Sequence, residues 1–118
     1  MRLMLALVAQ LQPLMDQIAD YDQEILHLFL THADSALCAS LPGAGKRLAA
    51  RLLAEMGDDR TRYADAGGLQ ALAGTAPIMF QSGADAKAQR RYAWIKPLRN
   101  AMQQFAWQST LPEPWAMA

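Results

Sequence analysis

Several features on which common protein classes depend are scarce in this 118-residue chain. Cys38 is its single cysteine, which excludes internal disulfide bonds and cysteine-rich metal sites. No apolar run approaches the roughly 18 residues that cross a membrane. The apolar start, Met1 to Ala9, continues in the phase of an amphipathic helix, which argues against a signal peptide. We therefore expect a cytoplasmic protein without a membrane partner, in which Cys38 is a buried small residue.

Net charge is also lacking, because 11 basic side chains balance 11 acidic ones. Residues 1–40 hold one of the basic and five of the acidic side chains, so their net charge is −4 and the remainder carries +4. An acidic segment before a basic body is typical of a body that faces nucleic acid. The apolar fraction of 53% is enough for a core, and the charged fraction of 19% is low for an independent domain. This composition suggests surfaces made for partners.

Metal ligands are scarce as well. His27 and His32 lie five residues apart with no carboxylate at chelating spacing. Asp20, Asp22 and Glu24 alternate along the sequence, so they do not all share one helical face. We expect no metal site and no cofactor in this chain.

What the sequence does contain begins with a heptad pattern. Apolar residues recur at alternating spacings of three and four: Met4, Leu7, Leu11, Leu14, Ile18, Tyr21, Ile25 and Leu28. The spacing predicts a coiled-coil-like helical arm over residues 1–33 that pairs with another helix, with a core-facing helix as the alternative. Pro13 interrupts the pattern, so either one helix kinks there or a second helix begins there.

A glycine-rich turn follows, Leu41-Pro42-Gly43-Ala44-Gly45-Lys46-Arg47, before a small-residue helix that runs to Met56. Two glycines at this spacing suit the tight turn of a helix-hairpin-helix, whose second helix directs free N–H groups toward a phosphate. Lys46 and Arg47 add positive charge. A turn that only joins two packed helices is the alternative. A nucleotide P-loop is excluded, because Ser40 and Arg47 occupy its required Gly and Ser/Thr positions.

The remaining segments predict a mainly α fold with one small extended or hairpin segment near 77–94. Asp34 or Ser35 is expected to cap a short helix over 36–41, and Gly57 to end the helix that follows. Asp65 is expected to cap a helix that Gly74 ends. A last helix starts near Pro97 and buries Leu98, Ala101, Met102, Phe105 and Ala106. Residues 34–118 would form one domain, cut off within a helix start at Glu113–Ala118.

Ser82 precedes Gly83 at the end of the extended segment, and Lys87, Arg90, Arg91, Lys96 and Arg99 follow it. A serine that attacks a phosphodiester needs an exposed mount and nearby cations. Without further evidence, the residue types around Ser82 indicate only an ordinary turn residue. The three arginines Arg90, Arg91 and Arg99 are read as supporting cations or as a solvated basic face.

The order of five short motifs resembles the C-terminal transposase domain of the insertion-sequence 110/116/902 family. These motifs are Leu41-Pro42-Gly43-Ala44-Gly45, Leu53-Ala54-Glu55-Met56-Gly57-Asp58, Leu72-Ala73-Gly74-Thr75-Ala76-Pro77, Gln81-Ser82-Gly83 and Leu98-Arg99-Asn100-Ala101-Met102. The resemblance covers roughly residues 35–115. The chain departs from that family's usual pattern at Asp85, just after the Ser-Gly pair, and at Pro97.

The resemblance implies a recombinase that moves insertion sequences, guided in some relatives by a non-coding RNA. Members of that family pair this domain with a RuvC-like domain whose acidic residues bind magnesium, and they act as oligomers. Ser82 would be the nucleophile that links to DNA, and Gly43, Gly45, Lys46, Arg47, Arg90, Arg91 and Arg99 would contact DNA. Magnesium would belong to the RuvC-like domain, which this chain lacks, so the chain alone is expected to be inactive. A non-catalytic helix-hairpin-helix module that binds nucleic acid and dimerises is the alternative.

Overall fold

The computed structural model describes residues 1–110 and is mainly helical, with one small antiparallel sheet, as predicted. The expected helix start at 113–118 lies outside the described residues. The elements in chain order are α1 (Arg2–Thr31), α2 (Ser35–Ala39), α3 (Lys46–Met56), η1 (Arg60–Arg62), α4 (Ala66–Ala73), β1 (Ile78–Ser82), β2 (Asp85–Gln89) and α5 (Lys96–Thr110).

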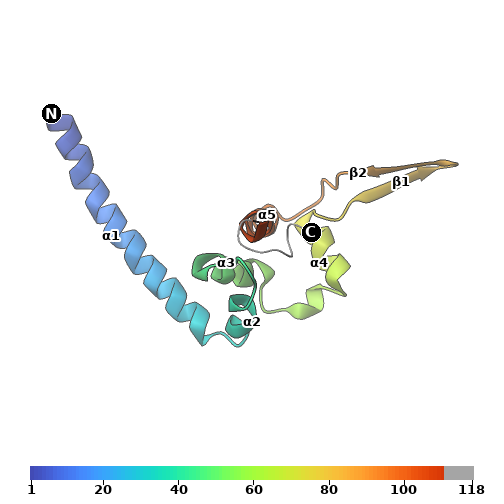
Figure 1. Cartoon of the computed structure of the whole chain (residues 1–118), viewed down its shortest axis with the longest axis horizontal. Helices are drawn as coiled ribbons and strands as arrows, with labels where there is room; N and C mark the ends of the chain where they lie inside the picture. The colour runs from blue at the N-terminus through green and yellow to red at the C-terminus, as the bar shows by residue number, and fades with distance from the viewer. Residues whose placement is uncertain (111–118) are drawn as a thin grey trace.

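The described chain is elongated. Its radius of gyration is 19.5 Å, whereas a compact chain of this length would have about 13 Å. Figure 1 shows the cause: α1 and the β1–β2 hairpin leave the helical body on opposite sides. The body, defined here as α2 to α5 without the hairpin, therefore carries one projection at each end.

Helix α1 is one continuous helix with Pro13 inside it, so the alternative of a second helix beginning at Pro13 is wrong. All of residues 1–21 are exposed, and Phe29 is the buried residue of the helix. The helix contacts the body only through its last turns, since Asp22 and Leu26 are half-buried. Most of the arm therefore has no apolar neighbour within the described chain.

The core lies around α3. Leu48 and Leu52 pack against Ala101 of α5, and Ala49 and Leu53 pack against Phe29 of α1 and Cys38 of α2. Cys38 is fully buried, as predicted, and this burial raises the pKa of its thiol. The apolar face predicted for α5 is confirmed at Leu98 and Ala101, but Ala106 is exposed. Helix α3 thus joins the arm to the rest of the body.

The predicted helix ends are confirmed on α3 and α4. Gly57 ends α3, Gly74 ends α4, and the Asp65 carboxylate accepts the N–H of Gly68 at 2.7 Å as the cap of α4. Helix α2 spans Ser35–Ala39 and not 36–41, and Asp34 lies at its N-cap position as predicted, but its side chain makes no capping hydrogen bond. Asp34 pairs instead with Arg60, whose guanidinium lowers the pKa of the Asp34 carboxyl.

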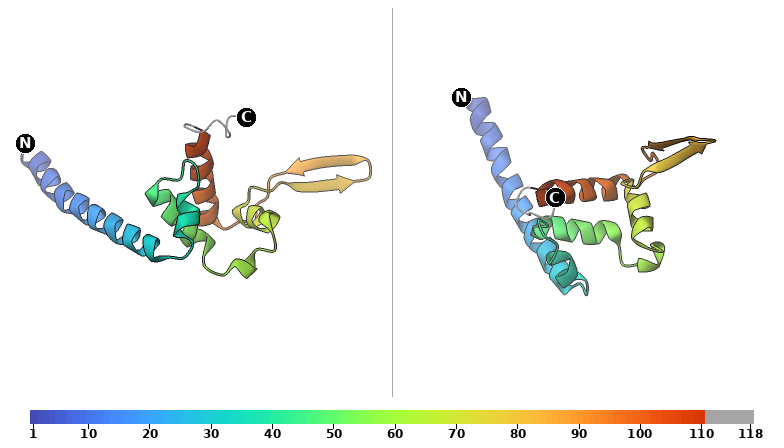
Figure 2. Two further views of the ribbon diagram at one scale, coloured as in Figure 1. Left: turned by 60° about the horizontal axis from the view of Figure 1, so that its bottom comes forward. Right: turned by 45° about the vertical axis from the view of Figure 1, so that its right-hand side comes forward.

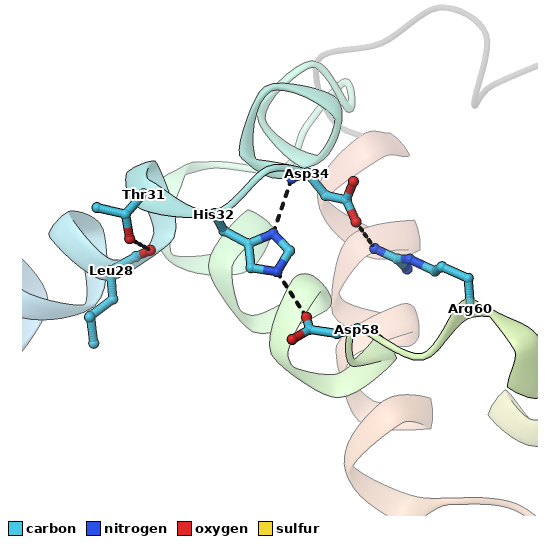
Figure 3. Close-up of polar contacts among 6 residues, drawn as sticks. All are labelled: Leu28, Thr31, His32, Asp34, Asp58 and Arg60. Carbon is cyan, nitrogen blue, oxygen red and sulfur yellow. Dashed lines mark hydrogen bonds and ion pairs between the residues drawn. The ribbon is translucent and has the colours of Figure 1, made fainter.

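His32 fixes the junction between the arm and the body (Figure 3). Its Nδ1 accepts the backbone N–H of Asp34 at 3.0 Å, so the hydrogen of the neutral ring is on Nε2. Nε2 lies 2.8 Å from a carboxylate oxygen of Asp58, just beyond α3. The ring therefore joins the end of α1 to the start of α2 and to the end of α3, a role that the sequence spacing did not reveal.

The β1–β2 hairpin is a projecting two-stranded sheet. Its register pairs Ile78 with Gln89 and Ser82 with Asp85, so Gly83 and Ala84 form a two-residue turn. Gly83 has φ +63°, while no non-glycine residue of the described chain has positive φ. This combination fits a type II′ turn, which takes glycine at its first central position.

Candidate nucleic-acid interface

Ser82 lies at the tip of the hairpin, exposed and far from the body. Five residues of strand span about 16 Å, so the tip projects well beyond α4 and α5 (Figure 2). Only the partner strand contacts β1 or β2 among the described elements. Ser82 therefore has the exposed position that a nucleophilic serine needs.

The hairpin register determines which side chains share a face with Ser82. Asp85 is directly opposite, and the next pair on that face is Phe80 with Lys87. Directly opposed side chains have Cβ atoms about 4.5–5.5 Å apart, and diagonal neighbours remain within reach of a long side chain. Ser82 is thus accompanied by one carboxylate and by the ammonium group of Lys87.

Arg90, Arg91 and Arg99 lie at the other end of the hairpin, beyond the Ile78–Gln89 pair. The Arg99 guanidinium carbon is 4.2 Å from the Trp94 ring centroid and that of Arg90 is 5.2 Å away. Arg91 is half-buried, and its Nε has no partner among the described atoms. The structure brings Arg90 and Arg99 together on Trp94, and it does not bring them to Ser82.

The glycine-rich turn connects α2 to α3, and its two glycines differ. Gly43 has φ +76°, and a Cβ there would lie 2.9 Å from the Cα of Ser109 in α5. Gly45 has φ −59° and open space around its Cβ position. The turn therefore needs glycine at position 43, both for its positive φ and for its close approach to α5, and at position 45 it needs glycine for neither reason.

Lys46 and Arg47 begin α3, and both are exposed. Arg47 pairs with Asp22 of the arm through an exposed contact, which partly compensates its charge. Lys46 has no ion pair within the described chain. The start of α3 is therefore a positive site that is also tied to the arm.

A cleft of about 1090 Å³ opens between the start of α3 and one face of α5. Lys46, Arg47 and Arg51 line it from α3, and no acidic residue does. From α5 it is lined by four amide side chains and one indole ring: Asn100, Gln103, Gln104, Gln108 and Trp107. Arg51 donates to the Gln104 carbonyl oxygen at 2.6 Å, which joins the two walls.

Within residues 1–110, no group of three or more His, Cys, Asp or Glu side chains could hold a metal ion. No helix of the same residues is both long and apolar enough to span a membrane.

Residues 35–118 match the family described as Transposase IS116/IS110/IS902. The chain belongs to this family. The match begins at the first residue of α2 and covers the turn, the cleft and the hairpin.

Three proteins of insertion elements are similar to this chain. A Streptomyces coelicolor protein assigned as the mini-circle transposase for IS117 is 39% identical over 98% of this chain. An uncharacterised 44.8 kDa protein of insertion element IS116 from Streptomyces clavuligerus is 39% identical over 70% of the chain. An uncharacterised 42 kDa protein of IS900 from Mycobacterium paratuberculosis is 35% identical over 73% of it. The matches span 28%, 20% and 22% of those proteins.

Sequence reasoning missed the cleft wall that α5 contributes. Arg51, Gln104 and Trp107 were not among the predicted site residues, although polar residues recur on α5 at helical spacing from Asn100 to Gln108. That recurrence was the available signal. Its meaning depends on which face α3 covers, and only the fold gives that.

Proposed function

We propose that this chain is the DNA-binding, serine-bearing part of an insertion-sequence transposase, with Ser82 as the nucleophile. The observation that supports it best is the position of Ser82: an exposed hydroxyl at the tip of a hairpin that projects from a body of this family. A group that attacks a DNA backbone must reach a phosphate without a steric clash between the body and the duplex, and a projecting hairpin provides that reach.

In the proposed step, the Oγ of Ser82 bonds to a phosphorus atom of DNA, and one bond from that phosphorus to a deoxyribose oxygen breaks. The hydroxyl proton passes to a base, and the departing oxygen takes up a proton. Lys87, on the same face of the hairpin, would oppose the repulsion between the Asp85 carboxylate and the phosphate. A second subunit or domain would supply the remaining groups, because Arg90 and Arg99 lie at the far end of the hairpin.

Backbone binding would use the start of α3. The turn with Gly43, the adjoining helices α2 and α3, and the exposed Lys46 support a helix-hairpin-helix contact to phosphates. Gly45, Arg47, Arg90, Arg91 and Arg99 would add contacts around it. A guide RNA belongs to the same proposal, because a basic surface attracts any phosphate backbone. The magnesium that the resemblance implies has no set of ligands among the described residues and would belong to another domain.

The salt dependence of duplex binding tests this proposal. We expect the Lys46→Ala, Arg47→Ala double variant to bind duplex DNA more weakly and with a flatter plot of log affinity against log salt. Each lost phosphate contact lowers the slope by about 0.9, so the change would approach about 1.8. It would fall short of this if the pairing of Arg47 with Asp22 persists on DNA. Fluorescence anisotropy at several salt concentrations measures the slope.

Arg62→Ala is the matched control, because Arg62 is an exposed cation in η1, away from the cleft. This control is expected to leave the slope unchanged. An unaltered slope in the double variant would remove the start of α3 from the proposed DNA contact.

We further propose that the arm pairs with the arm of a second copy. Its heptad seam is exposed along the whole helix, with Leu7, Leu11 and Leu14 each more than half exposed. In the first two heptads the flanking positions hold Val8, Gln10, Met15 and Gln17, so no like charges face each other there. Pro13 falls outside the seam.

Replacing two seam leucines should dissociate this assembly. We expect the Leu11→Asp, Leu14→Asp variant to weaken self-association by at least about 100-fold, because burial of one leucine contributes about 1.5–3 kcal/mol. Sedimentation equilibrium measures the change, with Gln12→Asp as a control for an added charge outside the seam. A monomeric wild-type chain at high concentration would contradict pairing of the arms.

A further inference from the structure

The cleft between α3 and α5 combines three kinds of groups. One wall carries Lys46, Arg47 and Arg51, which can neutralise phosphates. The other carries amide side chains, which can both donate and accept hydrogen bonds. Trp107 completes this wall with its side chain still 69% exposed.

Trp107 is the informative member of this set. An indole ring normally contributes to stability by burying its large surface, yet this one lies open beside three cations. The aromatic contact within the described chain is between Tyr92 and Trp94, and the cation–π contacts involve Tyr63, Tyr92 and Trp94. No described ring or cation therefore covers the face of Trp107, which remains open to stacking.

The amide wall is arranged along one face of α5. Asn100, Gln103, Gln104 and Trp107 are spaced at three, four and seven residues, so they project from the same side of the helix. Gln104 accepts a hydrogen bond from Arg51 through its carbonyl oxygen, which orients the amide and leaves its two N–H donors for another partner. A polar wall held in this way suits the edge of a nucleobase.

We propose that this cleft binds an unpaired nucleotide of a single-stranded nucleic acid. The base would stack on Trp107, the amides of α5 would contact its edge, and Lys46 and Arg51 would hold its phosphates. A base inside a duplex has both faces covered by its neighbours, so it offers no face to an indole ring; an unstacked base does. The absence of any acidic side chain from the lining fits a polyanion. This proposal rests on the proposed function and adds to it that the nucleic acid bound at this cleft is single-stranded.

Binding of the 118-residue chain to short fluorescein-labelled oligonucleotides tests the inference. The probes are single-stranded DNA, single-stranded RNA of the same sequence, and the matching DNA duplex. We expect Trp107→Ala to weaken single-strand binding by about 5- to 150-fold, the range for loss of one stacked base. Duplex binding should change less than about twofold, and Trp107→Phe should retain most of the single-strand affinity because it keeps a ring.

Tyr92→Ala is the matched control, since Tyr92 is an aromatic residue with 77% exposure outside the cleft. It should leave single-strand binding unchanged, and circular dichroism should show the same helix content for every variant. The DNA and RNA probes distinguish the two sources of an unpaired nucleotide. Weaker binding of either probe by the Trp107→Ala variant supports binding of an unpaired nucleotide in the cleft.

The inference is overturned if Trp107→Ala binds single strands as the wild type does, or loses single strands and duplex to the same degree. Failure of the proposed function has a different signature. The duplex salt slope would then be insensitive to Lys46 and Arg47, while the loss of single-strand binding in Trp107→Ala would still be observed.

Discussion

Ser82→Ala is expected to abolish any covalent attachment of the protein to DNA while leaving DNA affinity within about twofold of the wild type. The substitution removes the Oγ to which the proposal assigns the bond, and Ser82 is exposed and packs on nothing in the body. The measurement combines this chain with the metal-binding domain that the family resemblance implies. Adducts on end-labelled DNA are then separated under denaturing conditions, and the phosphorylated residue is located by mass spectrometry.

Ser40→Ala serves as the control, because it also removes an exposed hydroxyl from the chain without touching the hairpin. This control should form adducts at the wild-type level. An adduct that persists in Ser82→Ala would assign the nucleophile to another residue. A wild-type protein that cuts DNA without forming any adduct would contradict covalent chemistry at Ser82.

Gly43→Ala should cost about 2–5 kcal/mol of the free energy of unfolding. A side chain at φ +76° costs about 1–2 kcal/mol. The added Cβ would also lie 2.9 Å from backbone of α5, and the shift that this forces costs about 1–3 kcal/mol more. Urea denaturation followed by circular dichroism measures the difference. Since small domains are typically stable by only about 5–15 kcal/mol, the loss would be large.

Gly45→Ala is the matched comparison two residues later. Its φ of −59° suits any residue and nothing lies within 4 Å of its Cβ position, so only the cap preference of glycine over alanine is lost. That loss is about 0.5–1 kcal/mol. Equal destabilisation by the two substitutions would show that the turn does not pack on Ser109.

Local signals in the sequence predicted the helices well. The heptad spacing gave α1, and Gly57, Asp65 and Gly74 marked helix ends that the structure confirms. Asp34 lies at the predicted cap position of α2, but its carboxylate pairs with Arg60, 26 residues away, and not with the helix N–H groups. The second strand was harder to predict, since Asp85-Ala86-Lys87-Ala88-Gln89 holds no β-branched or aromatic residue and is defined by pairing with β1.

The candidate site was predictable only in part, because its parts come from distant segments. Ser82 and Lys46 follow from short motifs. The cleft requires Arg51 and Gln104 to meet across 53 residues, and His32 meets Asp58 across 26. Contacts between residues so far apart cannot be predicted from the spacing of neighbouring residues. The separation of Ser82 from Arg90 and Arg99 likewise follows from the strand register, and the sequence order alone suggests that they are close.

The isolation of the hairpin has an evolutionary consequence. Because β1 and β2 contact no other described element, substitutions within them leave the packing around α3 unaltered. The tip that carries Ser82 and the folding core can therefore accumulate changes independently of each other. Recombination between related elements could exchange one hairpin for another as an interchangeable cassette, with no compensating change in the helices that carry it.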